Sequence, residues 1–357
     1  MENKKLKIGF YNPYFDGLGG GERYTLTLAG HWSKLHEVSL FWDDPKIVGQ
    51  SEKRFGLDLT GVRVVPNIFK NANIFEKLWK SREYDLIFFL SDGSIPGSLA
   101  KHNILHFQVP FASVLADVWK LKRYDAIVCN SEFTKSELDP QVALHAMVIY
   151  PPVQQIDAGA QIKKKQILSV GRFTSYFQAK KQEVLIDAFI KGYKAGKFNH
   201  WELVLAGGLL PSDQQYFENL SKRVRGEPIR LLPNISNDEL IALYKTSRLY
   251  WHAAGFGETN PAQMEHFGIT TAEAMSAGVV PIVYAAGGQL EIVIDNVNGC
   301  VWRNVDELIQ KTHDLIVDKK KYTLFSLHGV QRAKDFSEEG FVRAFDTLIT
   351  GWLPIRA

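Results

Sequence analysis

Two carboxylates lie eight positions apart, on either side of a Phe-Gly-Ile turn that leads into a predicted helix. Glu265 precedes the turn, and Glu273 follows it. Carboxylates accept hydrogen bonds from hydroxyl groups, and the N-terminus of a helix attracts anions such as phosphate. A ligand that carries both hydroxyls and phosphates is a nucleotide sugar, so this segment predicts a site for one.

Each residue of this motif also has a structural alternative to consider. Thr270 followed by Glu273 fits a capping box, and Gly278 suits the position just after the helix, so Glu273 could simply cap it. Glu265 has no comparable structural explanation on its loop, which favours a ligand contact. Gly268 would let a phosphate approach the backbone amides, or would simply form a tight turn.

Two basic residues near the middle of the chain are candidate ligands for an anion. Arg172 follows the apolar run Ile167–Gly171, and Lys180 precedes a predicted helix. Together they could clamp a diphosphate, the arginine through paired hydrogen bonds and the lysine as a point charge. The alternative is that both are solvated surface charges beside a turn.

Two weaker signals lie in the first half. The glycine-rich segment 17–21 suggests either a ligand close to the backbone or a flexible turn. It is not the dinucleotide fingerprint G-x-G-x-x-G, because Glu22 stands where the third glycine would be. His106 closes an apolar run and should project towards a cleft, although a hydrogen-bonded core histidine is the alternative.

The elements that position these residues follow from short apolar runs alternating with helical segments. The runs are Leu6–Tyr11, Val38–Trp42, Val62–Val65, Asp85–Leu90, Ile104–Phe107, Ala126–Cys129, Met147–Tyr150, Ile167–Gly171, Glu202–Ala206, Arg230–Leu232, Leu249–His252, Val280–Tyr284 and Cys300–Trp302. Such runs are typical of parallel strands covered on both faces, so each half predicts a doubly wound α/β sheet. Ligand sites then lie at the carboxyl ends of the strands, facing the cleft between the halves.

The alternation breaks at Pro151-Pro152, which is followed by a polar segment typical of a linker. We therefore predict an N-terminal domain of residues 1–153 and a C-terminal domain of residues 154–337. The last helix, within residues 338–357, carries a broad apolar face that must be covered. We expect it to pack back on the first domain.

Composition excludes several classes of protein. The length of 357 residues suggests two domains, and 45% hydrophobic with 23% charged residues is typical of a globular protein. A net charge of +3 argues against a nucleic-acid surface. Cys129 and Cys300 are interpreted as buried hydrophobes in a reducing compartment. Without a signal-peptide or membrane-spanning run, we expect a cytoplasmic protein, and without Asp-x-Asp or clustered metal ligands we expect no metal.

Several short motifs occur in a fixed order along the chain. They are Gly19-Gly20, His106, Asn130-Ser131-Glu132-Phe133-Thr134, Tyr150-Pro151-Pro152-Val153, Gly171-Arg172 with Lys180, Glu265 with Glu273, Gly287-Gly288-Gln289-Leu290-Glu291, and Asn298-Gly299. With this ordered set the chain resembles, over essentially its whole length, the family 4 retaining glycosyltransferases of the GT-B fold. The resemblance implies two Rossmann-like domains facing across a cleft, the N-terminal on the acceptor side and the C-terminal binding the nucleotide sugar.

The resemblance also implies roles for the matching residues. Arg172 and Lys180 would hold the diphosphate, Glu265 would bind hydroxyls of the donor sugar, and His106 would lie beside the transferred sugar. The donor-binding set would be Gly19, Gly20, Lys181, Asn234, Ile235, Phe267, Gly268, Ile269 and Glu273. In this set Asn234 and Ile235 would meet the base, Glu273 the ribose, and the glycine backbone of the first domain the diphosphate.

One departure from the family pattern lies between Arg172 and Lys180. Here residues 174–179 form a longer segment than the usual short turn, and Lys181 replaces a common glycine. Either lysine could therefore be the phosphate ligand.

The implied activity is transfer of a hexose, with retained configuration, from a nucleotide sugar to a glycan or lipid-linked saccharide, as in polysaccharide biosynthesis, without a cofactor. The run His252–Gly257, leading to Met264–Gly268, is similar to mannosyltransferases that use GDP-mannose on lipid-linked oligosaccharides. We therefore expect mannose from GDP-mannose. The alternatives are a noncatalytic nucleotide-sugar-binding subunit and a sugar-nucleotide epimerase or hydrolase on the same fold.

A membrane contact is the last open question. The segment Asn67–Lys80 mixes large apolar residues with lysines, so it could lie on the inner face of an anionic membrane that presents the acceptor. The alternative is that this segment packs against the first sheet.

Overall fold

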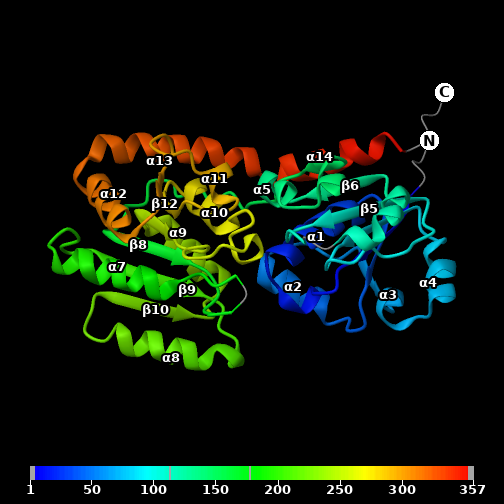
Figure 1. Cartoon of the computed structure of the whole chain (residues 1–357), viewed down its shortest axis with the longest axis horizontal. Helices are drawn as coiled ribbons and strands as arrows, with labels where there is room; N and C mark the ends of the chain where they lie inside the picture. The colour runs from blue at the N-terminus through cyan, green and yellow to red at the C-terminus, as the bar shows by residue number, and fades with distance from the viewer. Residues whose placement is uncertain (1–4, 112–113, 177, 353–357) are drawn as a thin grey trace. The chain divides into compact units, whose positions relative to one another are not determined.

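The chain forms two compact units, each built on a parallel sheet with helices on both faces (Figure 1). The computed structural model describes residues 5–111, 114–176 and 178–352. Unit 1 comprises Met1–Pro152 with Glu338–Ala357, and unit 2 comprises Val153–Ser337. The predicted pair of Rossmann-like α/β domains is thus the observed architecture.

Unit 1 contains the first seven strands of the described chain. They are β1 (Lys7–Tyr11), β2 (Glu37–Phe41), β3 (Val62–Val65), β4 (Leu86–Leu90), β5 (His102–Phe107), β6 (Ala126–Cys129) and β7 (Ala146–Val148). The helices are η1 (Phe15–Gly17), α1 (Gly20–Ser33), α2 (Ile47–Phe55), α3 (Ile68–Asn71), α4 (Ile74–Ser81), η2 (Val114–Arg123), α5 (Glu132–Ser136), α6 (Pro140–Ala143) and α14 (Glu338–Thr350). The strand order is β3-β2-β1-β4-β5-β6-β7, all parallel, so the order reverses between β1 and β4.

The two faces of this sheet pack against different helices, because successive residues of a strand point to opposite sides. On one face, Ile8 and Phe10 of β1 join Tyr24 of α1 in a single core cluster. The C-terminal helix α14 contributes Phe341 and Phe345 to the same cluster. The other face is covered by α3 and α6. The last helix of the chain therefore buries its apolar face in the core of unit 1.

Unit 2 repeats the pattern with six strands among its described residues. They are β8 (Gln166–Val170), β9 (Glu202–Gly207), β10 (Ile229–Pro233), β11 (Leu249–His252), β12 (Val280–Tyr284) and β13 (Cys300–Trp302). The helices are α7 (Gln182–Lys194), η3 (Pro211–Asp213), α8 (Gln214–Arg223), α9 (Asn237–Thr246), η4 (Pro261–Gln263), α10 (Ile269–Ser276), α11 (Gln289–Ile292), α12 (Val305–Val317), α13 (Lys319–Ala333) and η5 (Lys334–Phe336). Helices α7, α12 and α13 pack on one face and α9 and α10 on the other.

The strand order of unit 2 places the connections that follow β8 and β11 side by side. The order is β10-β9-β8-β11-β12-β13, and β8 pairs in parallel with both β9 and β11. The sheet therefore grows in opposite directions from the boundary between β8 and β11. In open α/β sheets, ligands bind beyond the carboxyl ends of the strands at such a switch point.

The apolar runs predicted the strands well. Five predicted strands match the structure residue for residue: Val62–Val65, Ala126–Cys129, Leu249–His252, Val280–Tyr284 and Cys300–Trp302. Helix α1 begins at Gly20, directly after its N-cap Gly19. In the described part of the chain, the structure contains no helix with the length and apolarity needed to cross a membrane.

Candidate functional site

An ion-pair cluster lies at the switch point of unit 2. The Nζ atom of Lys180 is 2.8 Å from Oε2 of Glu265, and Nε2 of His252 is 3.0 Å from the same oxygen. Lys180 lies in the connection after β8, whereas His252 ends β11 and Glu265 follows it. The fold thus joins two predicted site residues that are 85 positions apart in the sequence.

The charges of this cluster follow from its surroundings. Burial alone would raise the pKa of the Glu265 carboxyl, but the charge of Lys180 and the hydrogen bond from His252 hold that pKa well below its usual range. Burial lowers the pKa of His252, which is therefore neutral at pH 7. Its Nε2–H then donates to Glu265, while its buried Nδ1 has no partner among the described residues. Glu265, for which the sequence offered no structural explanation, thus has two side-chain partners in the fold.

Two glycines let the backbone of Glu265 approach the start of α11. The N–H of Gly288 donates to the carbonyl oxygen of Glu265 at 2.8 Å. A Cβ atom added at Gly287, where φ is +68°, would lie 2.1 Å from that same oxygen. The Gly-Gly pair therefore serves to hold the Glu265 loop in place.

The two candidate lysines have different partners. Lys181 pairs with Glu258 at 2.6 Å, not with Glu265. It is the N-cap of α7 with φ of +54°, a left-handed conformation that glycine adopts most readily. This geometry accounts for the glycine expected at its position. An ammonium group has three N–H donors, so Lys180 and Lys181 each keep donors for a further ligand.

The longer segment before Lys180 is anchored to the opposite loop. The backbone N–H of Gln178 donates to the side-chain oxygen of Gln263 at 2.9 Å, and its side-chain amide is 3.0 Å from Nδ1 of His266. Burial lowers the pKa of His266 to about 4, so this ring is neutral at pH 7. Residue 177 lies outside the described residues. The anchored segment links the connection after β8 to the one after β11.

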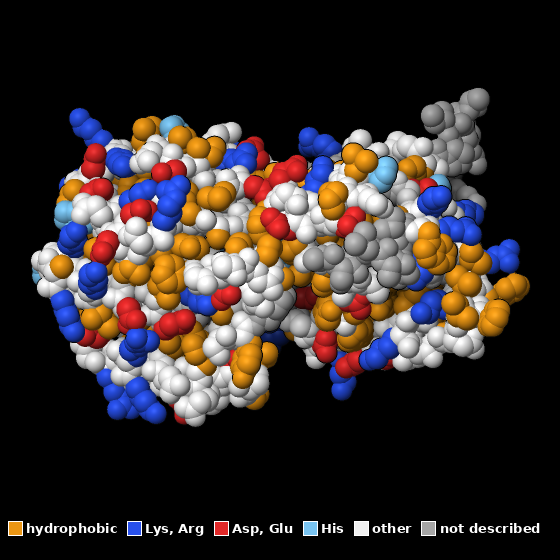
Figure 2. Space-filling model, viewed as in Figure 1, with side chains coloured by type: hydrophobic (Ala, Val, Ile, Leu, Met, Phe, Trp, Pro, Cys, Tyr) orange, Lys and Arg blue, Asp and Glu red, His pale blue; other side chains and the backbone are white. Residues whose placement is uncertain are grey.

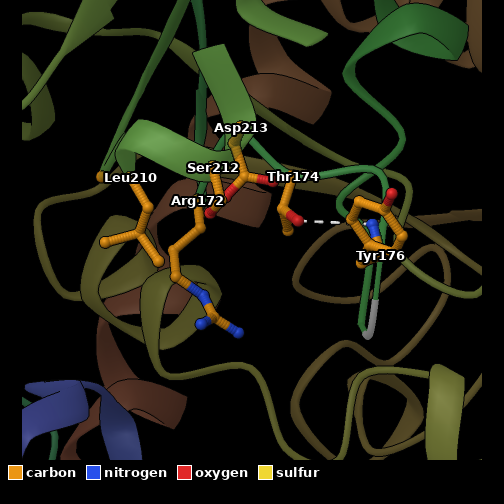
Figure 3. Close-up of a pocket in the computed structure, with 7 residues that line it drawn as sticks. Arg172, Thr174, Tyr176, Leu210, Ser212 and Asp213 are labelled. Atoms are coloured by element: carbon orange, nitrogen blue, oxygen red, sulfur yellow. Dashed lines mark hydrogen bonds between the residues drawn. The ribbon is translucent and has the colours of Figure 1, made fainter. Parts of the chain in front are cut away.

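Arg172 lies just beyond β8 and is exposed. Its guanidinium makes no ion pair with any residue that the structure describes, unlike the two lysines. Figure 3 shows this group pointing into the open part of a pocket, away from Asp213 and with Tyr176 on the opposite side. The pocket lining comprises Arg172, Thr174, Tyr176, Gly208, Leu210, Ser212 and Asp213. Arg172 is therefore free to bind an anion there.

Asn234 shapes the loop beside this pocket. It follows β10 in a left-handed conformation, with φ of +54°. Its side-chain oxygen accepts from the N–H of Leu209 at 2.8 Å, and its side-chain nitrogen donates to the carbonyl of Leu209 at 3.1 Å. Ile235 is half-buried against a core cluster of unit 2. The Asn234 side chain thus already has partners, and contact of either residue with a base remains a prediction.

Helix α10 begins with an N-terminus that no side chain caps. Gly268 is its N-cap, with φ of +115°, and Ile269 is its first residue. Phe267, just before, is buried at 2% exposure. An uncapped N-terminus leaves backbone N–H groups that an anion can bind. The glycine at this position is required by its left-handed backbone.

The predicted capping box is wrong. Because α10 starts at Ile269, Thr270 lies inside its first turn, and the hydroxyl of Tyr250 donates to Thr270 Oγ1 at 2.8 Å. Glu273 is buried in the middle of the helix and accepts a hydrogen bond from the hydroxyl of Tyr244 at 3.1 Å. Gly278 does follow the helix with φ of +73°, as predicted.

The side chain of Gln289 lies against the Gly268 turn. The sequence did not single this residue out as a candidate. It is fully buried, and neither its side-chain oxygen nor its nitrogen has a hydrogen-bond partner among the described residues. A Cβ at Gly268 would lie 2.4 Å from its nitrogen. An unpaired buried amide costs roughly 1–3 kcal/mol. Its only signal in the sequence was its place in the Gly-Gly-Gln-Leu-Glu motif.

The candidate residues of unit 1 lie in a different setting. His106 is fully buried in β5, its ring is stacked 4.0 Å from that of Tyr24, and its Nδ1 is 3.1 Å from the carbonyl oxygen of Val128. Burial lowers its pKa to about 3. Nδ1–H therefore donates to Val128, and Nε2 has no partner among the described residues. The expected projection into a cleft is wrong within unit 1, and the core alternative describes this residue.

The glycine-rich segment caps α1. The N–H of Gly19, the N-cap, donates to Oε2 of Glu22 at 2.7 Å, and Gly20 is the exposed first residue of the helix. A Cβ at Gly21 would lie 2.2 Å from the side-chain oxygen of Gln108. Within unit 1 the close neighbour of this backbone is therefore a glutamine side chain.

Across the described residues, no group of three or more His, Cys, Asp or Glu side chains is arranged to hold a metal ion. The absence of a metal from the reaction remains a prediction.

The sequence of unit 2 matches a known family of enzymes. Residues 154–329 match the family model described as glycosyl transferases group 1. An alpha-1,3/1,6-mannosyltransferase of Schizosaccharomyces pombe is 25% identical over 236 residues, which cover 56% of this chain and 46% of that protein. A Dictyostelium discoideum GDP-Man:Man(3)GlcNAc(2)-PP-Dol alpha-1,2-mannosyltransferase is 26% identical over 220 residues, covering 57% and 42%. The chain thus spans less than half the length of these two relatives.

Solved structures share the fold over the whole chain. A glycosyltransferase from Rickettsia africae has a TM-score of 0.76 at 16% identity, covering 99% of this chain and 100% of that one. Anabaena HepE, crystallised with UDP and glucose, has a TM-score of 0.72 at 18% identity, covering 97% and 100%. The chain therefore has the two-domain GT-B fold, and residues 154–329 of its second unit match the glycosyl transferases group 1 model.

Proposed function

We propose that this protein is a retaining glycosyltransferase of family 4 that transfers mannose from GDP-mannose to a glycan or lipid-linked saccharide. The observation that carries the proposal is the Lys180–Glu265–His252 cluster at the switch point of unit 2. A carboxylate held ionised at that place accepts hydrogen bonds from sugar hydroxyls. The uncapped start of α10 and the unpaired guanidinium of Arg172 add two binding groups for a diphosphate.

The proposed chemistry depends on charge that develops on the departing diphosphate. Arg172, Lys180 and the start of α10 would stabilise this charge more strongly in the transition state than in the bound donor. Retention would follow from attack on the same face that the diphosphate leaves. The leaving group could then take the acceptor proton, so that no separate general base is needed.

Within this scheme His252 is a positioning residue. It fixes Glu265 by donating its Nε2–H to the oxygen that Lys180 also contacts. Because the imidazole is neutral, it orients the carboxylate without neutralising its charge. Glu265 thus stays available to hydroxyl groups, while Lys180 keeps two N–H donors for phosphate.

The choice of donor and acceptor has separate support. The two curated relatives named above are mannosyltransferases, and the name of one specifies GDP-Man and a lipid-linked saccharide. The structural neighbour HepE, however, was crystallised with UDP and glucose. Both nucleotides therefore belong in the first experiment.

The test is to incubate the protein with GDP-mannose, GDP-glucose, UDP-glucose and UDP-N-acetylglucosamine, with and without saccharide acceptors, and to measure nucleotide release. Acceptor-dependent release from GDP-mannose is expected. Release without acceptor would instead indicate a hydrolase, and sugar conversion an epimerase. Binding without turnover for every donor and acceptor would indicate a nucleotide-sugar-binding subunit and contradict the proposal.

A further inference from the structure

An exposed apolar ridge lies on α4 of unit 1. Phe75 and Trp79 are one helical turn apart and are 81% and 69% exposed, and Ile74 at the start of the helix is 65% exposed. Arg82 follows on the same side, with its guanidinium 5.4 Å from the centre of the Trp79 ring. We call these four residues the α4 ridge. Figure 2 shows apolar side chains gathered at the edge of unit 1 that α4 occupies in Figure 1, with basic side chains beside them.

The ridge is not explained by packing within unit 1. In the preceding helix α3, Ile68 and Phe69 are buried and join the core on one face of the sheet. The segment Asn67–Lys80 is therefore divided. Helix α3 packs against the sheet, which was one of the two alternatives, while the large side chains of α4 remain outside the core. Isolated exposed hydrophobics are ordinary, but two aromatics and an isoleucine together on one short helix indicate a binding surface.

The charges beside the ridge are mainly positive. The carboxylate of Glu76 pairs with Lys80 at 2.7 Å, and that of Glu83 pairs with Lys7 at 2.8 Å. Arg82, by contrast, lies over an aromatic ring, and so does Lys77, whose Nζ is 5.9 Å from the centre of the Phe69 ring. Acidic groups are thus neutralised locally, while these cations remain available for an anionic partner.

We propose that the α4 ridge docks unit 1 on an anionic phospholipid surface. Phe75 and Ile74 would enter the boundary between headgroups and acyl chains, and Trp79 suits the interface because its ring is amphipathic. Arg82 and the neighbouring lysines would meet lipid phosphates, since long basic side chains extend past buried apolar groups. This binding does not depend on the proposed transferase activity.

The test is co-sedimentation with phosphatidylcholine vesicles that do or do not contain phosphatidylglycerol. The wild type should bind the anionic vesicles at least about tenfold more tightly than the neutral ones, and added salt should weaken binding. A Phe75→Ser, Trp79→Ser double variant should lose about tenfold or more in affinity. Leu144→Ser is the matched control, because Leu144 is 79% exposed in the same unit, and it should bind like the wild type.

All substituted side chains are exposed, so the variants should keep the wild-type melting temperature, which circular dichroism checks. Absence of wild-type binding, equal binding by the double variant, or equal binding to both kinds of vesicle would overturn the proposal. Sedimentation velocity tests another occupant of the ridge. A wild-type dimer that the double variant abolishes, together with no vesicle binding, would assign the ridge to a second copy of the chain.

Discussion

In unit 2 the candidate residues meet as charged side chains with mutual partners, whereas the candidate histidine of unit 1 lies in an aromatic core. Glu265 is held ionised by Lys180 and His252 at the edge of its sheet. His106 is one strand away from the corresponding switch point, stacked on Tyr24 and fully buried. Two similar sheets thus place their candidate residues in opposite environments.

This difference separates two kinds of functional argument. The cluster in unit 2 has a chemical capacity of its own, because an ionised carboxylate and an ammonium group can bind hydroxyls and phosphate directly. The position of His106 in unit 1 instead indicates a role in the stability of the fold, since its ring fills a core position. Substitutions in the two units should therefore separate effects on turnover from effects on folding.

The largest effect is expected for Glu265→Gln. Loss of the carboxylate charge should reduce kcat/KM for nucleotide release from GDP-mannose by roughly 10²–10³-fold, because the proposed ionic hydrogen bond to the sugar is lost. Glu258→Gln is the matched control, since it removes the partner of Lys181 instead, and it should change kcat/KM by less than about tenfold. Equal losses for both variants would contradict the special place given to Glu265.

The second effect concerns stability and tests unit 1. His106→Ala should lower the free energy of unfolding by about 3 kcal/mol, because it leaves a cavity beside Tyr24 and an unpaired carbonyl at Val128. Urea unfolding measures this change. His106→Phe should retain most of the packing. A loss of turnover in His106→Phe without loss of stability would instead place His106 beside the substrate.

The strands could be predicted because both faces of each sheet are covered. A strand such as Val280–Tyr284 is then apolar along its whole length, and its limits are visible without knowledge of its neighbours. The position of Lys180 at the end of a connection was similarly predictable from local pattern. Its partner was not, because the contact with Glu265 depends on which strands become neighbours in the sheet.

The errors have local physical causes. The capping box at Thr270 and Glu273 has the right spacing, but Gly268 adopts a left-handed backbone and begins the helix two residues earlier than that box requires. His106 ends an apolar run, yet its side chain points into the core of unit 1. The direction in which a single side chain points is decided by tertiary packing. Neither the spacing of Thr270 and Glu273 nor the apolar run at His106 contains that information.

The third prediction compares the two lysines. Lys180→Met should reduce kcat/KM for GDP-mannose by about 10²-fold, because it removes the proposed diphosphate ligand and leaves Glu265 without its ionic partner. Lys181→Met should reduce it by only a few-fold, since Lys181 pairs with Glu258 and not with Glu265. Measurements of kcat/KM and of GDP affinity for both variants decide which lysine binds phosphate. A larger loss for Lys181→Met would reverse the assignment.

The smallest effect is a dependence of stability on pH from buried neutral histidines. Burial lowers the pKa of His106 to about 3, below its value of about 6.5 in the unfolded chain, so the unfolded state takes up the proton first as the pH falls. The contribution of the neutral His106 ring to the free energy of unfolding is complete above about pH 6.5. It is lost towards pH 3, at about 1.4 kcal/mol per pH unit. Because its pKa is depressed, Glu265 changes the free energy of unfolding only below about pH 4.3. Between pH 7 and pH 5.5 the change in stability therefore reports the histidines.

Urea unfolding measures the free energy of unfolding at pH 7 and at pH 5.5. Between these two pH values it should fall by about 1 kcal/mol more in the wild type than in His106→Phe. Unit 2 holds two such rings, because burial lowers the pKa of His266 to about 4 and also lowers that of His252. In the His106→Phe variant, unit 2 should therefore lose stability more steeply than unit 1, where the half-buried His36 is the histidine left with a lowered pKa among the described residues; hydrogen exchange of the two sheets can resolve this difference. Parallel losses in both units would mean that the buried rings of unit 2 gain protons without unfolding, and would remove the neutral form assigned to His252.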